Sequence, residues 1–335
     1  MKETFLIVGL GSIGRRHLDC LRSIRPDSEI IVWRQHNQEP EIPLGADGVV
    51  FSLQEALEKR PMAAIISNPA PLHVEAGIAL ATHGVHLLIE KPLSNSLDGI
   101  DKLLKICSEK QSVLMVGYVL RFNQALWCFK EAIKEQLIGR VVSVRSEIGQ
   151  YLPDWRPGMD YRESVSAREV LGGGALLELS HELDYIRWIF GDVVSVSACI
   201  ERTGILDIDT DDLVELILEI HGDEGQKIIA NVHLDMLQRV VSRSCKAVGE
   251  KGILEWDAIS NTVRYYSGDE KCWHSLFEPQ VLPRNSIYTA QIESFLESIE
   301  SGNEPVITAG DGMAVVKIID SARQSSAKKE TVFLS

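Results

Sequence analysis

The chain has 335 residues, of which 45% are hydrophobic and 24% are charged, a composition typical of a globular protein large enough for two domains. Its formal net charge of −14 argues against nucleic acid or an anionic membrane as the main partner. No segment reaches the roughly 18 consecutive apolar residues that span a bilayer. Six cysteines without a CxxC pair indicate reduced thiols in the cytoplasm.

Apolar runs alternate with helical patterns over the first 120 residues. Runs of this kind are typical of strands that are buried on both faces of a sheet, with helices in the intervals. The alternation predicts crossover connections and therefore a doubly wound parallel sheet, a Rossmann domain over residues 1–120. The expected strands are 4–10, 29–33, 63–69, 85–91 and 113–118.

The pattern changes after residue 120. A helix near 122–136 is followed by strand-like runs that are separated mostly by turns. This predicts an α+β domain over residues 121–335, built on a large, mainly antiparallel sheet and closed by a helical section. Within the run 212–220, one face is apolar (Val214, Leu216, Leu218, Ile220) and the other is mixed (Leu213, Glu215, Ile217, Glu219). The apolar face should pack on helices, and the mixed face should be solvated or form an oligomer contact.

The segment GLGSIG places Gly9, Gly11 and Gly14 in the GxGxxG spacing, with Ser12 and Ile13 between them. It follows the first expected strand and opens a helix. In that context the glycines allow a tight turn and close approach of the backbone to a pyrophosphate at the helix N-terminus. The motif therefore predicts dinucleotide binding.

The end of the second expected strand bears on which dinucleotide binds. A carboxylate there would bind the ribose 2′-hydroxyl of NAD, but VWRQHN offers Arg34 instead. A guanidinium suits the 2′-phosphate of NADP, and the alternative is a solvated surface arginine. NADP is favoured over NAD.

The stretch ALLELSHELDYIRWIFG contains three polar groups at spacings of three residues: Glu178, His181 and Asp184. On a single helix they would lie on roughly one face. The imidazole can act as a general acid or base near neutral pH. The alternatives are a buried structural histidine and a metal site, and no further histidine stands at ligand spacing, so no metal is expected.

Several motifs together resemble the Gfo/Idh/MocA family, the relatives of glucose-fructose oxidoreductase and inositol dehydrogenase. They are the glycine fingerprint, the segment SNPAPLHVEAGIALATHGVHLLIEKPLS at 67–94, and GGG at 172–174 followed by an acid and a histidine. The resemblance covers nearly the whole chain. It implies an NAD(P)-dependent oxidoreductase that acts on a hydroxyl or ketone of a sugar, amino sugar or sugar nucleotide. It also implies a homodimer or homotetramer formed through the exposed face of the second-domain sheet.

The resemblance implies that Lys91 lies beside the nicotinamide and the substrate. A lysine at the carboxyl end of a parallel strand lies where ligands bind, and its ammonium can hydrogen-bond the reacting oxygen. The same resemblance implies cofactor contacts for further residues: Asn68, Pro69, His73, Glu90, Trp155 and Arg156.

By the same resemblance, His181 is the general acid or base for the substrate hydroxyl. The family usually has an aspartate and one more intervening residue before this histidine, whereas here Glu178 stands in its place. Either Glu178 or Asp184 would orient the imidazole ring. The departure from the family pattern leaves the role of Glu178 open.

The expected substrate ligands combine basic, aromatic and acidic side chains: Lys91, Arg121, Tyr161, Arg162, His181 and Asp184. Arginine forks bind carboxylate or phosphate, which favours an anionic carbohydrate-like substrate. Two alternatives stay open: a dinucleotide-binding regulatory protein without turnover, and a reductase of a non-sugar carbonyl or an imine.

Overall fold

The computed structural model describes residues 2–34, 41–222, 225–279, 283 and 285–334. The chain forms two compact units: unit 1 comprises residues 1–119 and 282–316, and unit 2 comprises residues 120–281 and 317–335. Residues 282–316 therefore group with unit 1, whereas the sequence places all of 121–335 in the second domain. Within the described ranges, none of the helices combines the length and apolar character needed to cross a membrane.

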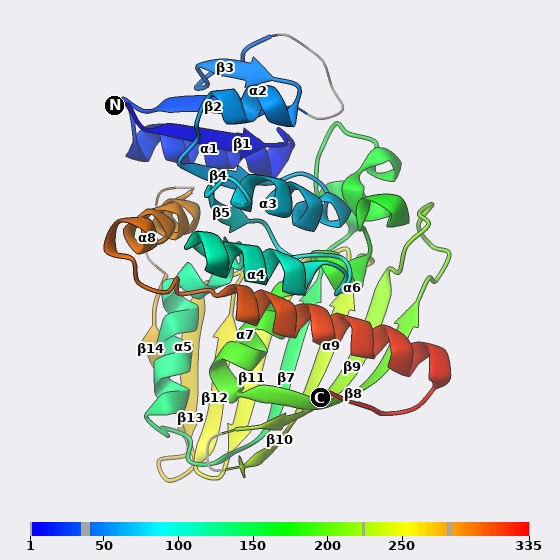
Figure 1. Cartoon of the computed structure of the whole chain (residues 1–335). Helices are drawn as coiled ribbons and strands as arrows, with labels where there is room; N and C mark the ends of the chain where they lie inside the picture. Colours follow the sequence, from blue (N-terminus) through cyan, green and yellow to red (C-terminus); the bar gives the residue numbers. More distant parts are fainter. Residues whose placement is uncertain (1, 35–40, 223–224, 280–282, 284, 335) are drawn as a thin grey trace. The chain divides into compact units, whose positions relative to one another are not determined.

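Unit 1 is built on a parallel six-stranded sheet with strand order β3-β2-β1-β4-β5-β6 (Figure 1). The residues of β1 are all buried, as expected for a strand covered on both faces. The predicted Rossmann sheet is confirmed, and only the short β3 was not expected. The strands are β1 (Thr4–Val8), β2 (Glu29–Trp33), β3 (Gly48–Val50), β4 (Ala63–Ile66), β5 (His86–Ile89) and β6 (Leu114–Val116).

The helices of unit 1 pack in pairs. Helix α1 contacts α8, and α3 contacts α4. The bounds are α1 (Ser12–Ile24), α2 (Leu53–Glu58), α3 (His73–Ala81), α4 (Ile100–Lys110) and α8 (Ser286–Ser301), with a 3₁₀ turn η1 (Ala70–Leu72) before α3. Helix α9 (Ala309–Lys328) begins in unit 1 and ends in unit 2.

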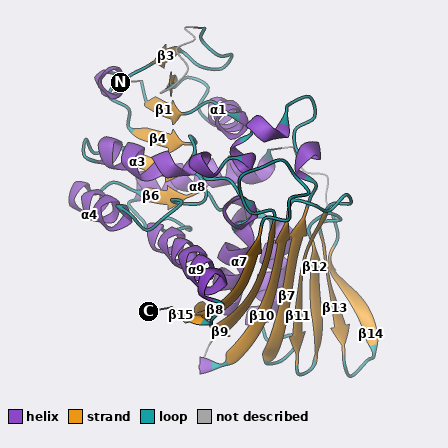
Figure 2. Ribbon diagram, turned by 90° about the vertical axis from the view of Figure 1, so that its right-hand side faces the viewer, coloured by secondary structure: helices purple, strands orange, loops and turns teal. Residues whose placement is uncertain are grey.

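Unit 2 is built on a nine-stranded sheet, order β14-β13-β12-β11-β7-β10-β9-β8-β15 (Figure 2). Only the β7–β10 pair is parallel, so the predicted, mainly antiparallel sheet is confirmed. The strands are β7 (Val141–Gly149), β8 (Asp192–Glu201), β9 (Leu213–His221), β10 (Lys227–Asp235), β11 (Ser242–Gly249), β12 (Gly252–Asp257), β13 (Thr262–Ser267), β14 (Cys272–Phe277) and β15 (Val332–Phe333).

The two faces of this sheet differ as the alternation in β9 predicts. Its apolar face is buried, with Val214 and Leu218 both 0% exposed, whereas Ile217 on the other face is 52% exposed. Helices α5 (Gln124–Lys134) and α7 (His181–Phe190) contact the sheet and lie over one of its faces (Figure 1). On the opposite face, ion pairs link neighbouring strands, among them Lys227–Glu219 at 2.6 Å.

Irregular backbone joins β7 to α6 (Ala175–Glu178) in unit 2. This segment contains four 3₁₀ turns: η3 (Leu152–Asp154), η4 (Tyr161–Glu163), η5 (Val165–Ala167) and η6 (Glu169–Leu171). It ends in Gly172, Gly173 and Gly174. A Cβ on Gly173 would lie 2.4 Å from the Val165 carbonyl oxygen, so the glycines let this segment pack tightly against the start of α6.

Candidate active site

In unit 1, the parallel strands bring three chain segments to one edge of the sheet. Val8 pairs with Ile66, and Ile66 pairs with Ile89. The residues that follow these strands, Gly9, Ser67 and Glu90, therefore share the carboxyl edge. The strand order reverses between β1 and β4, and ligands of doubly wound sheets bind at such a switch point.

The three glycines of the fingerprint serve different purposes. Gly9 has φ +83°, and a Cβ there would lie 2.9 Å from the Asn68 backbone. A Cβ on Gly14 would lie 2.4 Å from the Gly9 carbonyl oxygen. A Cβ on Gly11, by contrast, would meet nothing within 4 Å. The absence of a side chain at Gly11 therefore leaves open space beside the backbone, which fits a bound pyrophosphate.

Helix α1 presents its N-terminus at this open space. Gly11 is its N-cap, no side chain caps it, and its first turn carries no acid. Ser12 is exposed and Ile13 is half-buried. The helix dipole and backbone N–H groups therefore favour an anion here, as the sequence predicts for a dinucleotide.

Arg34 directly follows β2. Its backbone N–H donates to the Val50 carbonyl oxygen at 3.0 Å, and the residue is half-buried. This contact fixes the backbone at the end of the strand. Residues 35–37 of the VWRQHN motif lie outside the described residues.

His73 links the segments that follow β4 and β5. Its Nε2 lies 2.7 Å from the Asn68 carbonyl oxygen and its Nδ1 lies 2.9 Å from the Pro92 carbonyl oxygen. Burial lowers its pKa, although both carbonyl groups act in the opposite direction. His73 is only 1% exposed, so this geometry favours a positioning role, while Asn68 and Pro69 are half-buried.

Glu90 is held by two contacts and adjoins Lys91. Its Oε1 lies 2.6 Å from Nε2 of His17 on α1, and its Oε2 accepts the backbone N–H of Lys91 at 3.1 Å. Burial acts to raise the pKa of Glu90, but the hydrogen bond and charge of His17, with Lys91, lower it. One oxygen of this carboxylate is thus held by His17, and the other positions the backbone at Lys91, which is half-buried.

His17 was not predicted as a functional residue. It is fully buried on the face of α1 that also buries Leu18 and Leu21. A histidine on an otherwise apolar helix face is the only sequence signal for it, and that signal does not reveal Glu90, 73 positions away, as the partner.

In unit 2, the predicted single helix with Glu178, His181 and Asp184 on one face is wrong. Helix α6 ends at Glu178 and α7 begins at His181. The backbone departs from α-helical geometry at Leu179, whose φ is −99° and ψ is 19°. Glu178 and His181 are both half-buried, and each stands at the end of its own helix.

Asp184 and Arg121 contact each other. The Arg121 guanidinium donates to both carboxylate oxygens, at 2.7 and 3.0 Å, with both side chains at most 3% exposed. The sequence predicts both as substrate ligands, but this mutual pairing favours a structural role. Two residues earlier on the same helix, Glu182 is bound in the same way by Arg243, at 2.7 and 3.0 Å, a pair the sequence did not indicate. Two arginines therefore anchor the helix that begins at His181.

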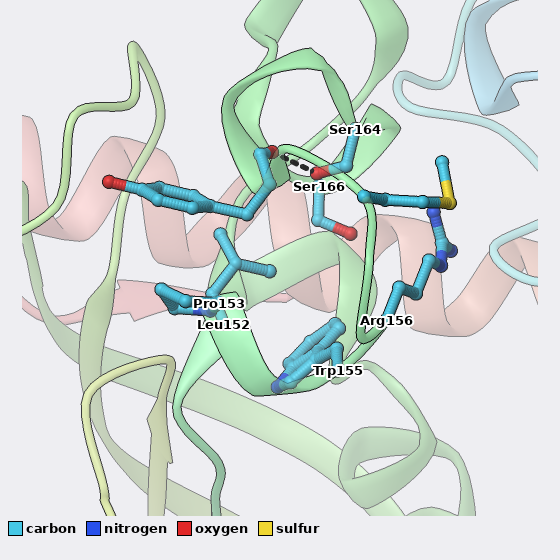
Figure 3. Close-up of a pocket in the computed structure, with 8 residues that line it drawn as sticks. Leu152, Pro153, Trp155, Arg156, Ser164 and Ser166 are labelled. Carbon is cyan, nitrogen blue, oxygen red and sulfur yellow. Dashed lines mark hydrogen bonds between the residues drawn. The ribbon is translucent and has the colours of Figure 1, made fainter.

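A small pocket in unit 2 brings together several predicted site residues (Figure 3). Trp155 donates its Nε1–H to the Gln150 carbonyl oxygen at 3.0 Å, which fixes the indole ring. The Ser166 hydroxyl is buried and has no hydrogen-bond partner within the described part of the chain. The pocket is lined by Leu152, Pro153, Trp155, Arg156, Met159, Tyr161, Ser164 and Ser166.

Tyr161 and Arg162 differ in their surroundings. Tyr161 lines the pocket, and its hydroxyl accepts the backbone N–H of Asp207 at 3.2 Å. Arg162 is exposed and binds Asp160 through a fork with distances of 2.6 to 3.0 Å. The Arg162 hydrogen bonds lower the pKa of Asp160 to about 2. The structure thus places Tyr161, but not Arg162, in the lining of this pocket.

Comparison with known families matches both parts of the chain. Residues 4–118 match the model described as "Oxidoreductase family, NAD-binding Rossmann fold". Residues 130–334 match the model described as "Oxidoreductase family, C-terminal alpha/beta domain".

Curated relatives of the chain include named dehydrogenases. Myo-inositol 2-dehydrogenase of Thermotoga maritima is 24% identical over 98% of this chain and 97% of its own length. D-xylose 1-dehydrogenase (NADP(+)) 2 of Haloferax volcanii is 25% identical over 79% of this chain and 78% of its own.

Solved structures share the fold at low identity. Levoglucosan dehydrogenase in complex with NADH and levoglucosan has a TM-score of 0.86 at 18% identity, with both chains covered completely. The WlbA dehydrogenase of Bordetella pertussis in complex with NADH and UDP-GlcNAcA has a TM-score of 0.82 at 21% identity, covering 100% of this chain and 99% of the other.

Proposed function

Because the chain belongs to the Gfo/Idh/MocA oxidoreductase family, we propose that it transfers a hydride between a nicotinamide dinucleotide and a carbohydrate-like substrate. It is an NAD(P)-dependent oxidoreductase that acts on CH–OH groups. The observation that carries the proposal is the carboxyl edge of the parallel sheet, where the glycine loop follows β1 and the Glu90-Lys91 segment follows β5, the two strands that flank β4. The cofactor, when bound, supplies the hydride acceptor or donor.

The proposed roles of the chain's own residues follow from their chemistry. The N-terminus of α1 binds the pyrophosphate beside Gly11. The Lys91 ammonium donates a hydrogen bond to the reacting oxygen, and Glu90 and His73 hold the backbone around it. His181, at the start of α7, takes or returns the proton of the substrate hydroxyl, and Glu178 orients its ring.

Substitution of the two proposed catalytic residues tests this function. Lys91→Ala and His181→Ala should each lower kcat by about a hundredfold or more, the usual scale of acid and base contributions. Affinity for the dinucleotide, measured by fluorescence titration, should stay nearly unchanged in both. If both variants retain full turnover, the proposed chemistry is wrong and a dinucleotide-binding protein without this mechanism becomes the better interpretation.

We propose NADP as the preferred dinucleotide, because Arg34 stands at the end of β2 where NAD-specific proteins carry a carboxylate. One curated relative is named for NADP(+), and two structural neighbours hold NADH. The unmutated protein should bind NADPH more tightly than NADH, and Arg34→Ala should narrow that difference. NADH binding at least as tightly as NADPH before mutation would refute the preference.

The pocket around Trp155 supports an anionic carbohydrate as the substrate class. An indole face can stack on a sugar ring, the Arg156 guanidinium can bind a carboxylate or phosphate, and Ser166 offers a buried hydroxyl. A panel of neutral sugars, uronic acids, sugar phosphates and nucleotide sugars would test this. Arg156→Gln should raise the KM of anionic substrates much more than that of neutral ones.

We also propose that the chain forms a homodimer or homotetramer through the open face of the unit 2 sheet, where Ile217 is 52% exposed among charged residues. Sedimentation at micromolar concentration should show an oligomer, and Ile217→Asp should shift it toward monomer. A monomer before mutation would reject this interface.

A further inference from the structure

The hairpin that joins β13 to β14 gathers three metal-ligating side chains. Cys272 and His274 alternate on β14, so their side chains emerge on one side of the strand, and Glu270 lies in the turn just before it. The His274 Nε2 lies 2.8 Å from Glu270 Oε2 and 3.3 Å from Cys272 Sγ. The Cys272 Sγ lies 3.7 Å from Glu270 Oε2.

These separations approach those of a tetrahedral zinc site. Zinc bonds of about 2.3 Å to sulfur and about 2.0–2.2 Å to nitrogen or oxygen place two ligand atoms about 3.3–3.6 Å apart. The two separations that involve sulfur already fall close to this range. Only the distance between Glu270 Oε2 and His274 Nε2 must increase, by about half an ångström, when a bound cation replaces the hydrogen bond between them.

The surrounding residues hold two of the ligands in place before any cation binds. The His274 ring stacks on Tyr265, its neighbour on β13, with centroids 5.0 Å apart and an interplanar angle of 20°. The Ser267 hydroxyl accepts the backbone N–H of Glu270 at 3.2 Å, and the Ser267 carbonyl oxygen accepts that of Lys271 at 2.8 Å. Such support reduces the ordering cost of binding.

The residue types select the cation. A thiolate and an imidazole bind borderline-soft divalent metals, whereas magnesium and calcium prefer oxygen ligands alone. Within the described part of the chain, this is the one group of three or more such side chains whose ligand atoms lie within 4.8 Å of one another. Glu270 and Cys272 are exposed and His274 is half-buried, so a cation in solution can reach all three.

We propose that Glu270, Cys272 and His274 form a Zn²⁺ site at the edge of the unit 2 sheet, with a fourth position open to water or an external ligand. The bound cation stabilises the hairpin that joins β13 to β14. None of its three residues takes part in the proposed catalytic reaction, so the metal site does not depend on that proposal.

Cobalt substitution in the full-length protein tests the site directly. One equivalent of Co²⁺ should produce a thiolate-to-metal charge-transfer band, and Zn²⁺ should displace it. Cys272→Ala should abolish the band, and His274→Ala should weaken binding at least tenfold. Cys199→Ala is the matched control, because Cys199 is also exposed and lies 3.8 Å from the Glu201 carboxylate. That variant should bind Co²⁺ like the unmutated protein.

Alkylation provides a second measurement that needs no variant. Zn²⁺ should slow the reaction of Cys272 with iodoacetamide at least tenfold, and leave the rate at Cys199 unchanged, as read by mass spectrometry of peptides. The proposal is overturned if the unmutated protein gives no thiolate band, if the band survives in Cys272→Ala, or if Zn²⁺ protects both cysteines equally.

Discussion

Two buried carboxylates close to the proposed catalytic residues are paired in different ways. In unit 1, Glu90 lies beside Lys91 and contacts His17 at 2.6 Å. In unit 2, Asp184 lies three residues after His181 and binds Arg121 at 2.7 and 3.0 Å. The second carboxylate oxygen of Glu90 accepts the backbone N–H of Lys91, whereas both oxygens of Asp184 accept from the Arg121 guanidinium.

The difference separates positioning of a reactive residue from anchoring of a helix. Arginine is always charged in proteins, so the Arg121–Asp184 pair changes only when the acid is protonated. Histidine can gain or lose a proton near neutral pH, and the carboxylate it faces also bonds the chain at Lys91. We therefore expect the unit 2 pair to govern stability and the unit 1 pair to govern both stability and turnover.

The largest effect should come from Arg121→Ala. It leaves the Asp184 carboxylate buried without its cation, which typically costs about 3–5 kcal/mol of unfolding free energy. Urea denaturation measures this loss. Arg162→Ala, which removes an exposed fork to Asp160, is the control and should leave the denaturation midpoint unchanged. Equal effects of the two substitutions would contradict the assignment of Arg121 as an anchor.

A smaller loss of stability is expected from Glu90→Gln. The amide oxygen can still accept the Lys91 N–H, so the cost should be about 1–3 kcal/mol, that of one imperfectly satisfied buried polar group. Because the folded pKa of Glu90 is lowered, its contribution is present above the unfolded pKa of about 4.3 and is lost as the pH falls below it.

Turnover distinguishes the two carboxylates more sharply than stability does. Glu90→Gln should lower kcat with little change in dinucleotide affinity, and should alter the pH profile of kcat. Asp184→Asn should affect stability while kcat of the folded fraction is retained. Loss of kcat in Asp184→Asn alone would reverse the two roles.

The smallest of the expected effects concerns His233, a half-exposed counterpart of the two buried pairs. Its ring lies 2.9 Å from Asp235 and 2.6 Å from Glu215. The hydrogen bond to Asp235, with that to Glu215, raises its pKa to about 9 despite partial burial. Its contribution is therefore fully present below the unfolded pKa of about 6.5 and is lost as the pH rises through about 9.

Water reaches the exposed Glu215 and part of His233 and screens this arrangement, so the loss should be only about 1 kcal/mol rather than the full value of the pKa shift. Denaturation at pH 6 and at pH 9.5 measures it, with His233→Gln as the reference. If the variant and the unmutated protein lose the same stability between these pH values, His233 is not the group responsible.

Local patterns were sufficient to predict much of the architecture. The expected strand 29–33 coincides with β2 in full, and the run 212–220 contains all but the last residue of β9. The alternation of β9 predicted which side chains are buried. Strand β11 was missed because SRSCKAVG is too polar to resemble a strand, although it pairs with β7 and β12 inside the sheet.

Long-range pairs account for what the sequence did not predict at the candidate site. The spacing predicts one helical face with Glu178, His181 and Asp184, but the helical geometry is interrupted between α6 and α7. Arg121 stands 63 positions from Asp184, and no local pattern reveals that they bind each other. The glycine loop was predictable because its three glycines and the following helix are contiguous in the chain.

The return of residues 282–316 to unit 1 has a consequence for how the protein is made. Helix α8 packs against α1, and its Ile292 and Phe295 side chains are almost fully buried. A ribosome releases α1 early, yet its partner α8 emerges only after the whole of residues 120–281. The nascent N-terminal segment therefore keeps apolar surface uncovered through most of translation, the condition under which chains aggregate or engage chaperones. The larger part of unit 2, residues 120–281, emerges as one stretch before α8 and can begin to fold on the ribosome while unit 1 still lacks that helix.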